Sequence, residues 1–150
     1  MVFIQLLAPV MAFLGFPLGL LLSFVSPEEM KSGKKYFELI QNLLLVFMLF
    51  FVFDYYSLPL IISMIITIIV FLGVFCWNNN YKSITLYILL AFLLYSSSKH
   101  PPLFALESSL IFMYGVPTGS LIKCKKKDSL KIVAKHSIFI LLTIFLLLFF

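Results

Sequence analysis

Glu107 is the residue of this sequence with the clearest chemical potential, because it is an acid inside an apolar stretch. It lies about 10 Å along a helix that begins near Pro101, at a rise of ~1.5 Å per residue. Inside a bilayer an ionisable group is costly, and it indicates a proton, ion or ligand site unless polar neighbours satisfy it. We expect Glu107 to be protonated or partnered, to point into a helix bundle, and to have Ser108 or another polar group close by. Structural pairing, with Lys99 or His100 within reach, is the favoured interpretation, and a ligand or proton role is the alternative.

Glu28 and Glu29 form a second candidate site, in a charged loop over residues 26–36. Two carboxylates beside lysines at headgroup level can hold a lipid headgroup or a metal ion, as a lipid-modifying enzyme would require. A solvated loop of mixed charge is the simpler interpretation. Ser26–Pro27 followed by two acids is also typical of a helix start, although Gly33 is expected to break any short helix there.

Glu38, Gln41 and Asn42 are spaced three and four residues apart, so they share one helical face. In an otherwise apolar span, that face is expected to meet protein or water rather than lipid. Asp54 lies at the turn after the same span, where an aspartate most often caps a helix or turn.

The pattern GxPxG occurs twice, one hundred residues apart. We predict helix breaks at both copies, because proline removes a backbone donor and kinks a helix, while the glycines allow close helix approach. Two broken helices that face each other form the midplane site of many transporters; kinked packing without a site is the alternative. Since each copy precedes a basic loop and a further span, the pattern also suggests a parallel repeat of the hairpins 1–50 and 101–150. The six residues concerned are Gly15, Pro17, Gly19, Gly115, Pro117 and Gly119.

No catalytic motif accompanies these residues. The sequence contains no HExxH, Walker loop, dinucleotide fingerprint or GxSxG. His100 and His136 are expected on opposite sides of the membrane, so they cannot share a metal ion. Cys76 and Cys124 are far apart and are expected to be free thiols. We therefore expect neither metal nor cofactor, and a non-enzymatic protein is favoured over an enzyme.

Composition decides the class of protein. The 150 residues are 63% hydrophobic and only 11% charged, whereas soluble domains average about 45–50% apolar and about 25% charged. A domain of this size leaves too much surface exposed to hide so many apolar side chains from water. The formal net charge of +5 comes from lysines in short loops, where lipid headgroups explain it without nucleic acid. The expected partners are membrane lipids and other membrane subunits or further copies of the chain.

Stretches of about 20 apolar residues, the length that crosses a bilayer, predict an all-α, integral membrane helical bundle. It forms a single polytopic membrane domain over residues 1–150. We predict six transmembrane helices, or five if the stretch 103–122, which is rich in polar residues and glycine, is re-entrant. The approximate spans are 2–25, 37–53, 58–76, 83–96, 103–122 and 132–150.

Lysine placement predicts the orientation. The run from Lys123 to Lys135 holds six of the eleven lysines, and lysine-rich short loops stay in the cytoplasm. With six spans, every lysine except Lys99 falls on that side, whereas five spans would place the first basic loop and this run on opposite sides. We therefore expect both termini outside, the lysine-rich loops in the cytoplasm, and a location in the cell membrane.

Three functions from different classes remain open. A structural or accessory membrane subunit is the leading interpretation, and an uncharged bundle with an exposed face of small residues would favour it. A small transporter or channel would use the GxPxG helix breaks and Glu107, and a polar cavity at Glu107 would favour it. A lipid-headgroup enzyme would be favoured by a groove open to lipid beside Glu28.

Overall fold

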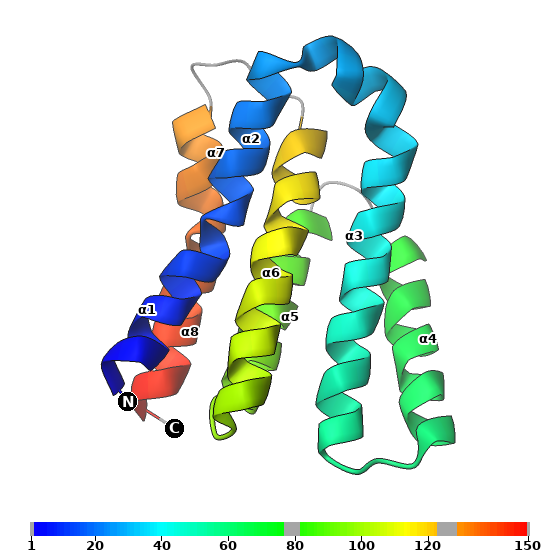
Figure 1. Cartoon of the computed structure of the whole chain (residues 1–150), viewed down its shortest axis with the longest axis vertical. Helices are drawn as coiled ribbons and strands as arrows, with labels where there is room; N and C mark the ends of the chain where they lie inside the picture. The colour runs from blue at the N-terminus through cyan, green and yellow to red at the C-terminus, as the bar shows by residue number, and fades with distance from the viewer. Residues whose placement is uncertain (1, 77–81, 123–128, 150) are drawn as a thin grey trace.

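Helices make up the described structure. The computed structural model describes residues 2–76, 82–122 and 129–149, and these ranges contain eight α-helices and no β-strand (Figure 1). In chain order they are α1 (Val2–Phe13), α2 (Gly15–Val25), α3 (Pro27–Tyr55), α4 (Leu60–Cys76), α5 (Lys82–Ser97), α6 (Pro101–Leu121), α7 (Ser129–His136) and α8 (Ile138–Phe149). The prediction of an all-α bundle is confirmed.

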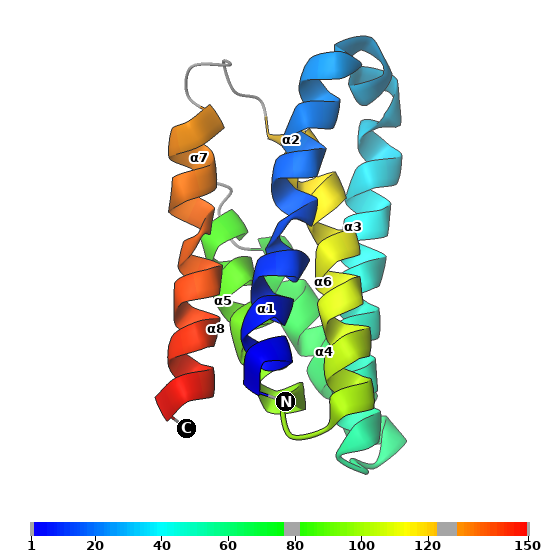
Figure 2. The same ribbon diagram turned by 60° about the vertical axis from the view of Figure 1, so that its left-hand side comes forward.

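The helices are arranged as rods that alternate in direction. α1 and α2 follow one another along one rod, and α7 and α8 along another, whereas α3, α4, α5 and α6 each form a rod of their own (Figures 1 and 2). The first and last helices bring both ends of the described chain to the same end of the bundle. α6 is the central rod, because it packs against α1, α2, α3 and α5. Any group on α6 is therefore held from several sides.

The start of α3 differs from the sequence prediction. The charged loop predicted over 26–36 is helical from Pro27 onward, and Gly33 does not break the helix. Pro27 occupies the first helical position, where its missing N–H would have no partner in any helix. One turn of this segment carries an ion pair between Lys34 Nζ and Glu38 Oε1 at 3.4 Å. A glycine costs a helix only about 1 kcal/mol, which a helix of 29 residues tolerates.

The predicted helix breaks are found in part. The first rod is interrupted at Leu14, between α1 and α2, and Pro17 falls in the first turn of α2, where backbone N–H groups have no helical partner. In contrast, α6 continues from Pro101 to Leu121 with Pro117 inside it. The break predicted over the second GxPxG copy is therefore wrong. Proline removes one backbone hydrogen bond, and packing on several sides of α6 holds the helix together across that gap.

The two GxPxG copies lie against each other in a glycine interface, formed by Gly15 and Gly19 of α2 with Gly115 and Gly119 of α6. A Cβ atom at any of the four would come within 3.0 Å of backbone atoms of the opposing helix; at Gly115 it would lie 2.6 Å from the backbone nitrogen of Phe16. Side chains are thus excluded between these two helices, and their backbones touch. Gly15 lies against an earlier part of α6 than Gly19 does, so the two helices run in the same direction. Common ancestry of the two hairpins stays a prediction.

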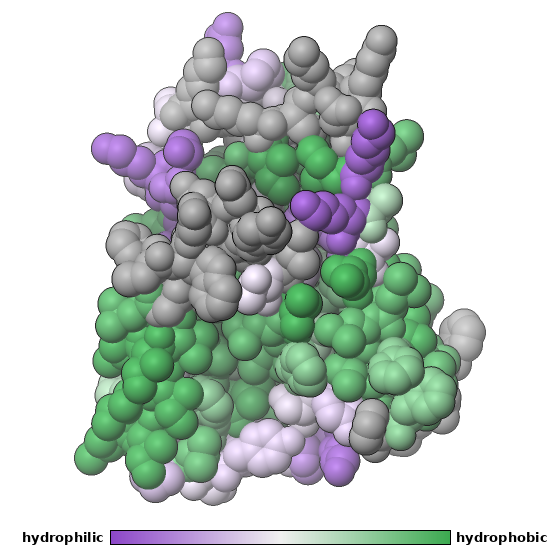
Figure 3. Space-filling view, turned by 180° about the vertical axis from the view of Figure 1, so that it is seen from behind, coloured by the Kyte–Doolittle hydropathy of each residue, from purple (hydrophilic) through white to green (hydrophobic). Residues whose placement is uncertain are grey.

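Around its hydrophobic core, the bundle exposes many large apolar side chains and buries several polar ones. On α4, which packs against α3, Ser63 and Thr67 are buried, while Ile61, Ile65 and Ile68 are more than half exposed. The Thr67 hydroxyl donates to the carbonyl of Ser63 at 2.8 Å, so it needs no solvent. Figure 3 shows a broad hydrophobic band between hydrophilic ends on one face of the molecule. A surface of this kind matches lipid rather than water.

The helix lengths agree with a membrane location. Three segments of the described chain are long and apolar enough to cross a bilayer: Leu6–Val25, Ser32–Tyr55 and Ser129–Phe149. Two shorter apolar helical segments are Leu60–Val70 and Thr85–Ser97. α6 is not among these, because Glu107 and its small polar residues lower the hydropathy of the helix. An integral membrane protein is consistent with these findings, and crossing by all six rods stays a prediction.

Candidate functional site

One side of α6 carries the polar groups of the bundle interior. Glu107, Tyr114 and Thr118 are spaced seven and four residues apart, which places them on one helical face together with Ile111. We call these four residues the inner face of α6. All four are buried, and Glu107 and Ile111 have no exposed surface. The sequence analysis singled out Glu107 but missed Tyr114 and Thr118, although the helical spacing from Glu107 could have identified them.

Gln41 of α3 joins the far half of this face. Its side-chain Nε2 donates to the Tyr114 hydroxyl at 3.0 Å and to Thr118 Oγ1 at 3.1 Å. The Thr118 hydroxyl in turn donates to the carbonyl of Tyr114 at 2.7 Å. The sequence predicted that the helical face with Gln41 contacts protein or water rather than lipid, and Gln41 does contact protein. Glu38, by contrast, is exposed and pairs with Lys34.

Glu107 points into the bundle, as expected, but the partners expected for it are engaged elsewhere. Neither carboxyl oxygen has a hydrogen-bond partner among the described residues. The Ser108 hydroxyl donates to the carbonyl of Ala105 at 3.0 Å. His100 Nδ1 is hydrogen-bonded to the Tyr55 hydroxyl, and the two rings lie 4.2 Å apart between centroids. The polar partner expected for Glu107 is therefore not hydrogen-bonded to it among the described residues, and a protonated carboxyl group stays a prediction.

The surroundings of Glu107 are apolar on the neighbouring helices. α3 runs antiparallel to α6, so the position seven residues after Gln41 lies level with the position seven residues before Tyr114. Met48 therefore lies at the level of Glu107. On α5, the ring of Tyr87 faces Tyr114 with 6.4 Å between the ring centroids. Leu94 is seven residues after Tyr87, so it also lies at the level of Glu107. Met48 and Leu94 are both fully buried. Among the described residues, an ionised carboxylate at this level has no hydrogen-bond partner to compensate its charge.

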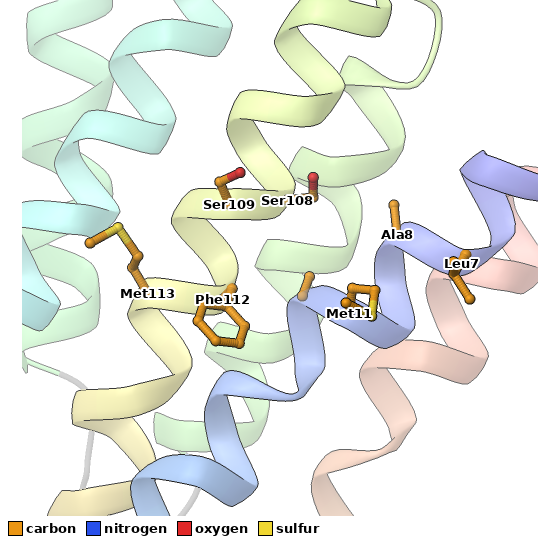
Figure 4. A pocket seen from close by; sticks show the side chains of 8 residues that line it. Leu7, Ala8, Met11, Ser108, Ser109, Phe112 and Met113 are labelled. Atoms are coloured by element: carbon orange, nitrogen blue, oxygen red, sulfur yellow. The ribbon is translucent and has the colours of Figure 1, made fainter.

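A groove opens on the opposite side of α6. It has a volume of about 520 Å³ and lies between α1 and α6 (Figure 4). Ser109 is two residues from Glu107, which is about 200° around the helix, and its hydroxyl donates to the carbonyl of Ala105 at 2.8 Å. The groove thus faces away from Glu107, and it is not the polar cavity at Glu107 that was expected to favour a transporter. It is lined by Leu7, Ala8, Met11, Ala12, Ser108, Ser109, Phe112 and Met113.

His136 belongs to an aromatic cluster in the core. Its ring stacks on Phe16 at 4.5 Å and meets Tyr87 edge-on at 5.3 Å. Its Nδ1 lies 2.8 Å from the carbonyl oxygen of Ile132. His100 lies at the start of α6 and His136 at the end of α7, so the two are not brought together. Within the described ranges, no group of three or more His, Cys, Asp or Glu could hold a metal ion.

The remaining candidate residues lie apart from Glu107. Glu28 is exposed in the first turn of α3, at the opposite end of the bundle from the foot of α6. The side chains of Glu29 and Cys76 lie outside the described residues, as do residues 77–81 and the segment 123–128 with Cys124.

Comparison with known proteins adds no further constraint on function. The chain matches no family model, no curated protein and no solved structure.

Proposed function

We propose that the protein is a small multi-pass membrane transporter or channel in which Glu107 binds a proton or another small cation. The observation that carries this proposal is a fully buried carboxyl group whose two oxygens have no partner among the described residues. A buried polar group without a partner lowers stability, and an ionisable group of this kind inside a membrane indicates an ion or proton site.

A partner helix cannot supply the missing interaction. Glu107 has no exposed surface, so a lysine or arginine on another membrane protein would have no access to it from the lipid side. His100 at the foot of α6 is engaged by Tyr55. A ligand small enough to move between packed helices is the remaining way to balance the carboxylate charge.

The proposed topology has six spans, with both termini outside and the lysine-rich loops in the cytoplasm of the cell. Ser32 and Ser57 bracket the apolar part of α3 and should lie on opposite sides. Cysteine replacements at these positions, on a chain from which Cys76 and Cys124 have been removed, can be labelled in intact cells with an impermeant thiol reagent. Labelling of position 57 alone supports the topology, and labelling of both from one side contradicts it.

Glu107→Gln tests the proposed function directly. The purified protein is placed in liposomes that contain a pH-sensitive dye, and uptake of protons is followed after a pH step. We expect the variant to lose the protein-dependent flux while remaining folded, because the amide keeps the shape and cannot ionise. Glu38→Gln is the matched control, since Glu38 is an exposed acid on α3. Equal flux in the wild type and in Glu107→Gln would rule the proposal out for protons, and the same comparison with sodium or potassium gradients would extend the test to those ions.

The groove between α1 and α6 favours a second candidate, a structural or accessory membrane subunit. Its walls combine small residues, such as Ala8 and Ser109, with the half-exposed methionines Met11 and Met113. Small residues in an apolar surface allow another membrane helix, or a second copy of this chain, to approach closely. Cysteine cross-linking from position 113 in the membrane would detect such a neighbour. The lipid-headgroup enzyme gains no support, because Glu28 is exposed and remote from the buried polar groups.

A further inference from the structure

The inner face of α6 is divided by one apolar residue. Tyr114 and Thr118 form a hydrogen-bonded cluster with Gln41, whereas Glu107 stands alone. Ile111 lies between the two parts, four residues after Glu107 and three before Tyr114, and has no exposed surface. Along the helix axis, Ile111 is about 6 Å from Glu107 and about 4.5 Å from Tyr114. A short chain of water molecules could bridge this distance if the isoleucine side chain moved aside.

Toward the start of α6, Glu107 is separated from the surface by more side chains than it is toward the Gln41 cluster. Leu103 and Phe104 are both buried between Glu107 and the start of α6. Beyond them, the hydrogen bond between Tyr55 and His100 links the end of α3 to the start of α6. Two apolar side chains and a side-chain pair therefore separate Glu107 from this end, whereas one side chain separates it from the Gln41 cluster.

The Gln41 cluster is connected to the end of the bundle where α3 begins. Gln41 is half-buried rather than fully buried, and Thr118 lies in the last turn of α6. One helical turn or more before Gln41, Lys34 and Lys35 are exposed on α3. The cluster therefore reaches toward the polar surface, and its hydroxyl and amide groups can both accept and donate hydrogen bonds.

We propose that the ligand of Glu107 is a proton, that it is exchanged with the surface through the Gln41–Tyr114–Thr118 cluster, and that Ile111 is the barrier between the two. This inference deepens the proposed function and rests on it. In the exchange, the carboxylate of Glu107 takes a proton from a hydrated proton on the cluster side and becomes the neutral acid; release reverses the step, and no other bond changes. The titratable groups on the elements around the route are Tyr114 on α6 itself and Tyr87 on α5, while α3 contributes the neutral Gln41 and Met48.

The choice of a proton follows from the packing. Hard metal cations such as calcium take roughly six to eight oxygen ligands. At the level of Glu107, its own carboxyl group is the only oxygen ligand identified among the described residues. Met48 and Leu94, which the helix register places level with Glu107, and Ile111, one turn further along α6, are fully buried apolar side chains. A proton needs neither additional ligands nor space, and it removes the charge that this layer cannot stabilise.

Replacement of Ile111 tests the barrier. We expect Ile111→Ser to let water connect Glu107 with the cluster, because the new side chain is smaller and polar. Proton flux in dye-loaded liposomes should then rise by at most about tenfold, because flux across the membrane must also pass the more strongly closed His100 end. Ile111→Val is the matched control and should leave the flux near that of the wild type. The double variant Ile111→Ser/Glu107→Gln should fall to the level of Glu107→Gln, which shows that the added flux passes through the carboxyl group.

A chemical readout that does not depend on flux accompanies this test. A water-soluble carbodiimide should modify Glu107 faster in Ile111→Ser than in the wild type, as measured by mass spectrometry of the folded protein. If Ile111→Ser fails to fold, Ile111→Ala serves in both assays. Unchanged flux and unchanged modification in the serine or alanine variant, with Glu107→Gln still inactive, would overturn the barrier while leaving the proposed function intact. Normal flux in Glu107→Gln would overturn both.

Discussion

Helix α6 meets α2 and α3 in two different ways. Against α2 it presents glycines, so that the two backbones touch and no side chain intervenes. Against α3 it presents Tyr114 and Thr118, which are held by the long side chain of Gln41. In the contact between α2 and α6 the backbones touch, so neither helix can shift without a clash. The contact between α3 and α6 is made by side chains that can rotate, and it leads to the unpartnered Glu107.

The difference indicates which part of the bundle is fixed and which part can move. Close backbone packing gains dispersion energy from many atoms, and a displacement of either helix loses most of it. Side-chain hydrogen bonds between membrane helices contribute little each, with an average of about 0.6 kcal/mol. We therefore expect α2 and α6 to behave as one unit, and any motion that opens a route to Glu107 to occur between α6 and α3.

The largest expected effect is at the glycine interface. Gly19→Ala should lower the free energy of unfolding by about 3 kcal/mol, the upper end for overpacking, because the new methyl group would meet the backbone of Val116. Reversible unfolding in mixed detergent micelles measures the change. Gly33→Ala is the matched control: its methyl group would meet only the Phe37 ring at 3.3 Å, and the gain in helix propensity is about 1 kcal/mol. If Gly19→Ala is as stable as Gly33→Ala, the contrast between the two contacts of α6 does not hold.

The next effect has the opposite sign. Glu107→Leu should raise the free energy of unfolding by about 2 kcal/mol, because an unpartnered buried polar group is replaced by an apolar side chain of similar volume. The same variant should abolish proton flux. A gain in stability together with a loss of flux is expected only if Glu107 serves proton transport at the expense of stability. A clear loss of stability would instead show that the carboxyl group has a structural partner.

A smaller effect is expected at the contact with α3. Gln41→Leu should cost about 1 kcal/mol, since two hydrogen bonds are lost while Tyr114 and Thr118 remain buried. A double-mutant cycle with Tyr114→Phe isolates the coupling between the two side chains, and we expect about 0.6 kcal/mol. Zero coupling would mean that Gln41 and Tyr114 do not interact in the membrane.

The smallest effect is expected at the end of the bundle. Tyr55→Phe removes an exposed hydrogen bond to His100 and should change the free energy of unfolding by less than about 0.5 kcal/mol. Tyr56→Phe, which removes a hydrogen bond to the carbonyl of Ser96, is the control at the same end. Because Leu103 and Phe104 still close the His100 end of α6 in both variants, neither variant should alter proton flux. An increase in flux in Tyr55→Phe alone would show that the Tyr55–His100 pair limits proton passage at that end.

The sequence by itself determined the class of fold. Its apolar runs have the length and composition of membrane helices, and hydrophobicity acts through the whole run rather than through single positions. The sequence also identified Glu107, because an acid between apolar residues is conspicuous at any helical register. It identified the four glycines as points of close approach, since a missing side chain is a local property.

Only the tertiary structure decided how these parts meet. Gly33 and Pro117 weaken a helix locally, yet α3 and α6 continue through them, because packing against neighbouring helices outweighs a propensity cost of a few kcal/mol. The pairing of the two GxPxG copies and the reach of Gln41 to Tyr114 join residues far apart in the chain. The isolation of Glu107 depends on the same long-range packing, since Ser108 turns to its own helix and His100 turns to Tyr55. No local pattern contains that information, because it arises from which helix faces lie opposite each other in the bundle.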